Sequence, residues 1–157
     1  MVNQFFIVMI FLATFCSLPG CNNPTIPMSN LEMIKSTYEG KTSEENGKNL
    51  AKYLAIGARW TEAQGFPYAG AYIGFDAISK NVFSRLASEW IDYKITIEDY
   101  LVSDERVVAY GTYSGAYKAT GKLFKARVAH LWKVENGKII SFEQIVDSKP
   151  VRDAMIQ

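Results

Sequence analysis

The 157-residue sequence has few of the side chains that bind metals or form disulfides. It contains one histidine and two cysteines, and both cysteines, Cys16 and Cys21, precede Met28. The segment that begins at Met28 therefore has no thiol, which excludes a disulfide or a cysteine nucleophile within it. One histidine without a cysteine is also too little for a structural zinc site. We accordingly expect neither a metal nor a cofactor.

The sequence also lacks an excess of charge of either sign. Seventeen lysines and arginines face 16 aspartates and glutamates, so the formal net charge is +1. No run of basic residues appears that would attract phosphate groups over a distance. We do not expect nucleic-acid binding.

Charged residues are absent from the first 27 positions. Phe5 to Leu18 is a mostly apolar run, too short to cross a hydrocarbon core of about 30 Å but suited to a secretory signal. The run ends at LPGC, residues 18–21, which resembles the lipobox of bacterial lipoproteins. In that motif Cys21 is the lipidated residue.

Residues 1–27 are therefore expected to be a signal peptide or lipoprotein leader, and the product a membrane-anchored lipoprotein or an exported, periplasmic protein. The leader has no lysine or arginine before its apolar run, and Pro19 is unusual in a lipobox. The alternative is that translation starts at Met28 and that the protein is cytoplasmic. Membrane contact is expected only through a lipid on Cys21.

Residues 28–157 have the length of one ordinary domain. Its first part shows the apolar spacing of helices. The pattern SNLE, from Ser29, is typical of a capping box that opens a helix. Ser43 is the candidate N-cap of a second helix that runs to about Ile56, and a third helix is expected after Gly74.

From Trp90 onward the apolar period changes to two, which is typical of strands. Gly111 and Gly115 suggest bends or bulges in a long strand, and the dipeptide NG at 136–137 predicts a two-residue hairpin. A short helix is expected after Pro150. Three helices followed by about four antiparallel strands predict an α+β domain, a cone-shaped curved sheet wrapped by helices. The expected strands are 91–97, 107–117, 123–135 and 138–147.

The predicted hairpin fixes a register for the last two strands. If Glu135 pairs with Lys138, His130 lies opposite Glu143, which either satisfies a buried imidazole or shares a pocket with it. The predicted pocket face carries Phe124, Val128, His130, Trp132, Glu143, Ile145 and Asp147, and the opposite face carries Lys125, Arg127, Leu131, Lys133, Phe142 and Gln144.

Asp147 follows Glu143 by four residues on the same strand, a distance of about 13 Å. It can share the pocket with Glu143, or it can cap the end of the sheet.

The segment WTEAQGFPYAGAYIGFDAI, residues 60–78, places one carboxylate in an aromatic, turn-rich loop. If Trp60, Phe66 and Tyr68 desolvate Glu62, its pKa rises into the range of a general base near neutral pH. The alternative is a solvated loop acid. The predicted pocket residues of this loop are Trp60, Phe66, Tyr68 and Tyr72, although such tyrosines are most often packing residues with a hydroxyl at the rim.

Three stretches resemble the SnoaL-like branch of the nuclear transport factor two-like superfamily, which includes ketosteroid isomerases and polyketide cyclases. They are WTEAQGFPYAGAYIG, GTYSGAYKATGK and AHLWKVENGKIISFEQ, and the resemblance extends over nearly all of 28–157. It implies a cone-shaped α+β fold, a hydrophobic pocket and a homodimer formed through the outer face of the sheet.

The ketosteroid isomerases use a tyrosine on the first helix, an aspartate base and an acid on the third strand. The resemblance places the tyrosine at Tyr38 and the base at Glu62. The strand acid falls on Ala129, so that donor is missing, and this alignment turns Ala129 rather than His130 toward the pocket. In polyketide cyclases the key acid lies near the end of the last strand, where Asp147 is the nearest match.

Two functions follow. In the first, Glu62 takes a proton beside the carbonyl of a small hydrophobic ligand, Tyr38 holds the enolate oxygen, and His130 or Asp147 returns the proton. In the second, the domain is a non-catalytic binding or interaction module, tethered to a membrane through Cys21.

Overall fold

The computed structural model describes residues 28–157, so the expectations for the leader and for Cys21 lie outside the described residues. No helix in this range is long and apolar enough to cross a membrane. The helices are α1 (Asn30–Ser36), α2 (Ser43–Tyr53), α3 (Gly74–Ile78), α4 (Ser84–Glu89) and α5 (Ser148–Met155), with a π-helical turn over Ser79–Phe83, and the strands are β1 (Leu54–Glu62), β2 (Gly70–Ile73), β3 (Trp90–Ser103), β4 (Arg106–Tyr117), β5 (Leu123–Glu135) and β6 (Lys138–Val146).

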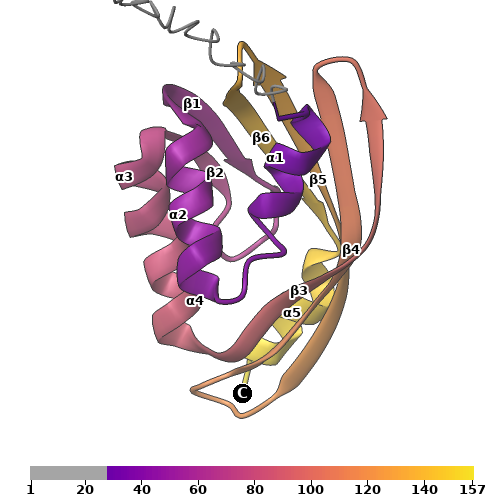
Figure 1. The fold of residues 1–157 in the computed structure, drawn as a ribbon. Coiled ribbons are helices and arrows are strands. Elements are labelled where there is room, and N and C mark those ends of the chain that lie inside the picture. Colours follow the sequence, from indigo (N-terminus) through magenta and orange to yellow (C-terminus); the bar gives the residue numbers. More distant parts are fainter. Residues whose placement is uncertain (1–27) are drawn as a thin grey trace, which may run out of the picture.

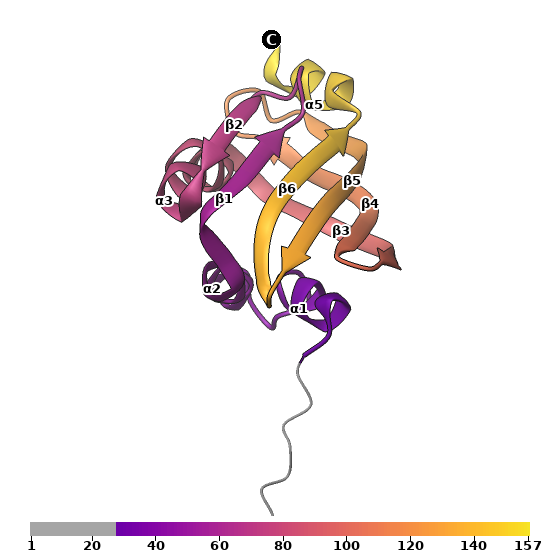
Figure 2. The ribbon, with the colours of Figure 1, turned by 90° about the horizontal axis from the view of Figure 1, so that it is seen from above.

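Across residues 28–157, six strands form one curved, unclosed sheet in the order β2-β1-β6-β5-β4-β3. Neighbouring strands are antiparallel except β1 and β6, which run parallel. The sheet curves around α2, α3 and α4 (Figure 1), and Figure 2 shows the strands side by side in this order. The α+β prediction is confirmed, but the sheet has six strands rather than about four.

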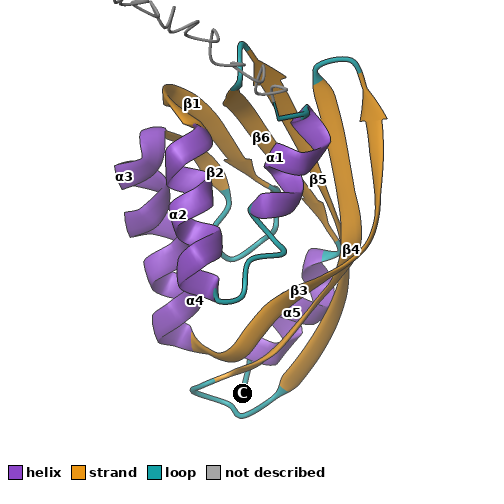
Figure 3. Ribbon diagram, viewed as in Figure 1, coloured by secondary structure: helices purple, strands orange, loops and turns teal. Residues whose placement is uncertain are grey.

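The two additional strands lie in segments that the sequence assigns to a helix end and a loop. Helix α2 ends at Tyr53 rather than near Ile56, and β1 begins at Leu54. Glu62 is consequently the last residue of a strand and not a loop acid. Figure 3 shows both β1 and β2 as strands. A strand that pairs in parallel with β6, far along the chain, depends on non-local contacts that local spacing does not reveal.

The helix starts follow the predicted capping chemistry with shifts of one residue. Ser29 and Glu32 form the capping box of α1 as expected. The N-cap of α2 is Thr42, one residue before the predicted Ser43, and its hydroxyl accepts a hydrogen bond from the Glu45 backbone. The third helix begins at Gly74, one residue earlier than predicted.

A bulge in the β5–β6 hairpin reverses part of the predicted register. Glu135 pairs with Lys138 as predicted, but the register shifts by one residue near Ile140, and His130 lies opposite Gln144. One extra residue in a strand moves every later side chain to the other face. The prediction that His130 faces Glu143 is therefore wrong.

The same bulge decides which residues of β6 point inward. Phe142 and Gln144 are buried on the face that carries His130, opposite to the predicted assignment. Glu143 and Ile145 point to the exposed outer face, so their prediction as pocket-facing residues is wrong.

The bulge predicted in the strand of Gly111 lies instead in the neighbouring strand β3. The register of β3 shifts between Ile97 and Asp99, directly opposite Gly111. A Cβ atom at Gly111 would overlap the carbonyl oxygen of Thr96, so only glycine lets the two backbones approach this closely.

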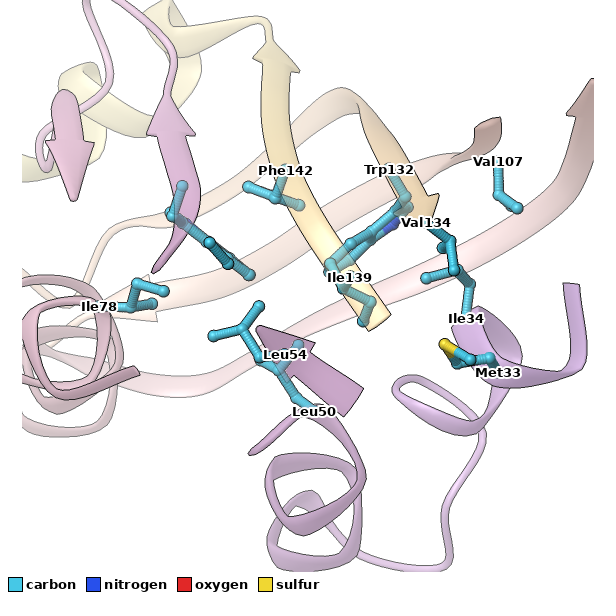
Figure 4. Packing of buried hydrophobic residues seen from close by; sticks show 12 residues of the cluster. Met33, Ile34, Leu50, Leu54, Ile78, Val107, Trp132, Val134, Ile139 and Phe142 are labelled. Carbon is cyan, nitrogen blue, oxygen red and sulfur yellow. The ribbon is translucent and has the colours of Figure 1, made fainter. Parts of the chain in front are cut away.

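Two clusters of buried side chains form the interior. The first joins α1 and α2 to the sheet, and Figure 4 shows Ile34, Leu50, Trp132, Ile139 and Phe142 packed within it. The second lies under α5 and around β3 to β5. Each large apolar side chain buried in this way contributes about 1.5–3 kcal/mol relative to exposure.

Candidate functional site

A cavity of about 280 Å³ lies where the two clusters meet. An apolar wall with a few convergent polar groups is typical of a small-molecule site. The wall includes Leu50, Trp60, Phe66, Phe83, Leu86 and Phe142, and the polar groups include Tyr38, Glu62, Tyr93, Tyr113, His130 and Gln144.

Glu62 is held inside the cavity at the end of β1, with 4% of its surface exposed. Its Oε1 accepts a hydrogen bond from Trp60 Nε1 at 2.7 Å, and its Oε2 has no partner among residues 28–157. Burial raises the pKa of the carboxyl group to about 7, because desolvation outweighs the hydrogen bond from Trp60. Glu62 can therefore gain or lose a proton near neutral pH.

His130 connects two tyrosines that come from distant parts of the chain. Its Nδ1 lies 2.6 Å from the Tyr38 hydroxyl and its Nε2 lies 2.5 Å from the Tyr113 hydroxyl. Tyr38 follows α1, and its backbone carbonyl accepts a hydrogen bond from the Asn46 side chain of α2. The loop, β4 and β5 thus place three polar side chains in one line.

Further groups support both ends of this line. Trp132 Nε1 donates to the Tyr38 hydroxyl at 2.8 Å, and Gln144 Nε2 donates to the Tyr113 hydroxyl at 3.2 Å. The Gln144 amide is in turn oriented by the Ala63 backbone N–H, which donates to its Oε1 at 3.3 Å.

Burial also determines the charge of these groups. Desolvation lowers the pKa of His130 to about 3, so its imidazole is neutral at physiological pH. Desolvation likewise raises the pKa of Tyr38 and of Tyr113, so both phenols keep their hydrogens. The line therefore consists of uncharged hydrogen-bonding groups.

Tyr93 on β3 adds another unused polar group to the cavity. Its hydroxyl is buried and has no hydrogen-bond partner within the described chain. Buried polar atoms in native proteins are nearly always paired, so an unpaired hydroxyl and the unpaired oxygen of Glu62 in one cavity indicate a place for a polar ligand.

Six of the residues predicted for the site lie together around the cavity. Its polar members are Tyr38, Glu62 and His130. His130 points inward as the alternation of β5 predicts, although its partner on β6 is not the predicted Glu143. Ala129, the inward residue by alignment with the isomerases, is on the other face of β5. The predicted aromatic members of the wall are Trp60, Phe66 and Trp132.

The other four predicted residues do not line this cavity. Tyr68 is buried in the second cluster, where its hydroxyl donates to Glu89, and the Tyr72 hydroxyl donates to the Tyr68 carbonyl oxygen. Asp147 is exposed and caps α5 by accepting from a backbone N–H. Glu143 lies on the outer face, beyond the bulge.

Sequence reasoning missed Tyr93, Tyr113 and Gln144. A signal for Tyr113 exists, because strand alternation places it on the same buried face of β4 as Ala109 and Gly111. No local pattern predicts Gln144, since its direction depends on the bulge.

Among residues 28–157, no group of three histidine, cysteine or acidic side chains could hold a metal ion.

Comparison with known proteins identifies the family. Residues 38–142 match the model of the SnoaL-like domain. An NTF2-like protein from Burkholderia thailandensis E264 is 37% identical, with 80% of this chain and 96% of that chain covered and a TM-score of 0.76.

More distant structures share the fold. An NTF2-like protein of unknown function from Burkholderia pseudomallei K96243 is 22% identical, with 83% and 100% of the two chains covered and a TM-score of 0.73. A candidate SnoaL-like polyketide cyclase from Mesorhizobium loti is also 22% identical, covering 75% and 99%, with a TM-score of 0.63. No curated protein matches the sequence. This chain belongs to the SnoaL-like family and has the NTF2-like α+β fold.

Proposed function

We propose that this protein binds a small, largely apolar carbonyl compound in the cavity and moves a proton on it, with Glu62 as the base and no cofactor. The main evidence for this proposal is the unpaired Oε2 of Glu62, which is buried in a cavity that also holds several hydroxyl groups. A carboxyl group with a pKa near 7 is well matched to proton transfer at neutral pH.

The proposed reaction needs two sets of groups. Glu62 removes a proton from the carbon beside the carbonyl; the electron pair of that C–H bond forms a C=C double bond, and the π pair of the C=O bond moves to the carbonyl oxygen. Hydrogen-bond donors must then face the developing enolate oxygen. The hydroxyls of Tyr38, Tyr93 and Tyr113 line the same cavity and have this chemistry. Protonated Glu62 returns the proton to the same carbon or, where the enolate is conjugated with a C=C bond, to the far carbon of that system. Asp147, the other predicted acid, is outside the cavity.

The size of the cavity limits the ligand. A volume of about 280 Å³ holds about nine water molecules at roughly 30 Å³ each. This favours a ligand of one or two rings over a four-ring steroid. The apolar wall favours hydrocarbon rings without charge.

Hydrogen–deuterium exchange tests the proposal without knowledge of the natural substrate. Monocyclic ketones and enones would be incubated with the protein in D₂O, and loss of the proton beside the carbonyl followed by ¹H NMR. We expect exchange with the wild type and a loss of at least about 100-fold with Glu62→Gln, the scale typical of general-base catalysis.

Glu143→Gln provides the matched control, because Glu143 is an acid of the same length on the outer face of the sheet. It should leave exchange unchanged. Thermal melting with each compound would show whether both proteins still bind it, because a ligand of the native state raises the melting temperature. Equal exchange by wild type and Glu62→Gln would contradict the proposal.

A second candidate function, a non-catalytic carrier or sensor held at a membrane, is favoured by the LPGC motif that ends at Cys21. A compound that stabilises the wild type and Glu62→Gln, but exchanges with neither, would support it. The mass of the intact protein tests the tether: acylated Cys21 supports it, and an N-terminus at Met28 or Ser29 contradicts it and supports a cytoplasmic protein.

A further inference from the structure

The line Tyr38–His130–Tyr113 contains one hydroxyl hydrogen more than it can bond internally. A neutral imidazole has one N–H donor and one acceptor nitrogen, and each phenol has one hydrogen. Both ring nitrogens of His130 are occupied by a phenol. One tyrosine must therefore donate to the ring while the other accepts from it.

The groups outside the line prevent the surplus hydrogen from being absorbed there. The indole N–H of Trp132 is a donor only, so the Tyr38 oxygen accepts from it. Gln144 presents its NH₂ group to Tyr113, because the Ala63 N–H occupies the amide oxygen. Both tyrosine oxygens are thus already acceptors from outside. The tyrosine that also accepts from His130 keeps a hydrogen that neither His130, Trp132 nor the Gln144 NH₂ group can accept.

The tautomer of His130 decides which tyrosine this is. With the hydrogen on Nε2, Tyr38 donates to Nδ1 and Tyr113 keeps a free hydroxyl hydrogen. With the hydrogen on Nδ1, the directions reverse and Tyr38 keeps the free hydrogen. Both tyrosines line the cavity, so a ligand that prefers one end selects one tautomer.

The remaining unpaired groups favour the Tyr113 end. The rings of Tyr93 and Tyr113 lie 5.2 Å apart, and the Tyr93 hydroxyl is the other buried phenol without a partner in residues 28–157. Gln144 connects the Tyr113 hydroxyl to the backbone N–H of Ala63, the residue after Glu62, so the end of β1 that carries Glu62 lies on the same side. Two donor hydrogens and the proposed base therefore gather at one end of the line.

We infer that this end is an oxygen subsite, which binds the carbonyl or phenolate oxygen of a one- or two-ring ligand between Tyr113 and Tyr93. Neutral His130 is a positioning residue that turns the Tyr113 hydrogen toward that oxygen. The position of Glu62 beside the ligand rests on the proposed function, but the oxygen subsite requires no turnover. His130 itself does not contact the ligand oxygen in this arrangement.

The single histidine of the chain makes the tautomer directly measurable. The full chain would be labelled with ¹⁵N-histidine, and the two ring nitrogens followed by NMR with and without 4-nitrophenol, a one-ring probe. We expect a neutral ring from pH 5 to 8 and, with the probe bound, the hydrogen on Nε2. An imidazolium ring, or a bound complex with the hydrogen on Nδ1, would overturn the inference.

Binding of 4-nitrophenol provides an independent measurement, since its visible absorbance reports the ionised form. Titrations in Glu62→Gln would remove the repulsion between a carboxylate and the phenolate. In this background we expect Tyr113→Phe to weaken binding at least about tenfold, the scale of one hydrogen bond to a charged group. Tyr93→Phe should weaken it as well, and Tyr38→Phe less, because Tyr38 acts only through His130.

Tyr110→Phe is the matched control, because Tyr110 is on the same strand as Tyr113 but on the outer face of the sheet. Unchanged affinity in both Tyr113→Phe and Tyr93→Phe would overturn the oxygen subsite. The proposed function can fail independently of this inference. If 4-nitrophenol binding and the His130 tautomer are as expected but ketone exchange does not depend on Glu62, Glu62 is not the base and the oxygen subsite still stands.

Discussion

At the scale of single residues, two buried groups with opposite titration behaviour face one cavity. Burial raises the pKa of Glu62 to about 7 and lowers that of His130 to about 3. On folding, Glu62 gains affinity for a proton and His130 loses it. Between about pH 4.5 and 6.5 their contributions to the free energy of unfolding therefore change in opposite directions and partly cancel.

Replacing Glu62 should reveal how much its titration changes the free energy of unfolding. Because the pKa of Glu62 is higher in the folded state, its stabilising contribution is complete below pH 4.5 and is lost as the pH rises through about 7. Relative to wild type, Glu62→Gln should therefore become more stable by about 3 kcal/mol between pH 4.5 and 8. Urea unfolding of both proteins at several pH values measures this. A constant difference would show that Glu62 titrates normally.

At the scale of elements, a bulge and a cap place the acids of the last strand. The shift near Ile140 turns Gln144 inward and Glu143 outward. The strand then ends, and Asp147 becomes the N-cap of α5. The acid that the family resemblance suggests for cyclase chemistry is thus used to start a helix.

Asp147→Ala should separate stability from activity. Loss of an N-cap side chain costs about 1 kcal/mol, whereas the cavity would keep all its polar groups. We expect a lower urea midpoint and unchanged ketone exchange. Asp147→Ser, which retains a capping oxygen, should restore most of the stability. A loss of ketone exchange in both variants would indicate that Asp147 takes part in proton transfer.

At the scale of the whole molecule, the sheet has two different faces. The inner face carries the cavity, and the outer face exposes large apolar side chains, among them Ile91, Leu123 and Ile145. Ile91 and Leu123 both lie beside Ala116, so they form one continuous patch. A patch of this kind is typical of a surface that a partner covers.

We propose that a second copy of the chain covers this outer face, as the family resemblance implies. Leu123 is 82% exposed in the single chain, so Leu123→Lys should not disturb folding of one subunit. We expect light scattering to give a dimer for wild type and a monomer for Leu123→Lys, with Lys125→Leu as a control that adds apolar surface to the same strand. A monomeric wild type would contradict the proposal.

Local patterns in the sequence were sufficient for the start of α1, the long strands and part of the aromatic surroundings of Glu62. The capping box at Ser29, the apolar period of two after Trp90 and the NG turn at 136–137 each depend on neighbouring residues alone. Such short-range preferences are carried by the residues themselves, and they hold in the structure.

Only the tertiary structure decided how distant positions meet. The parallel pairing of β1 with β6 places Glu62 in the cavity, and the bulge near Ile140 decides the inward face of β6. The contacts of His130 join positions 38 and 113, which are 92 and 17 residues away along the chain. These arrangements depend on packing across the whole sheet, where a shift of one residue reverses a face. The sequence therefore determined the fold class and identified Glu62 as the candidate base, and packing determined which groups surround it.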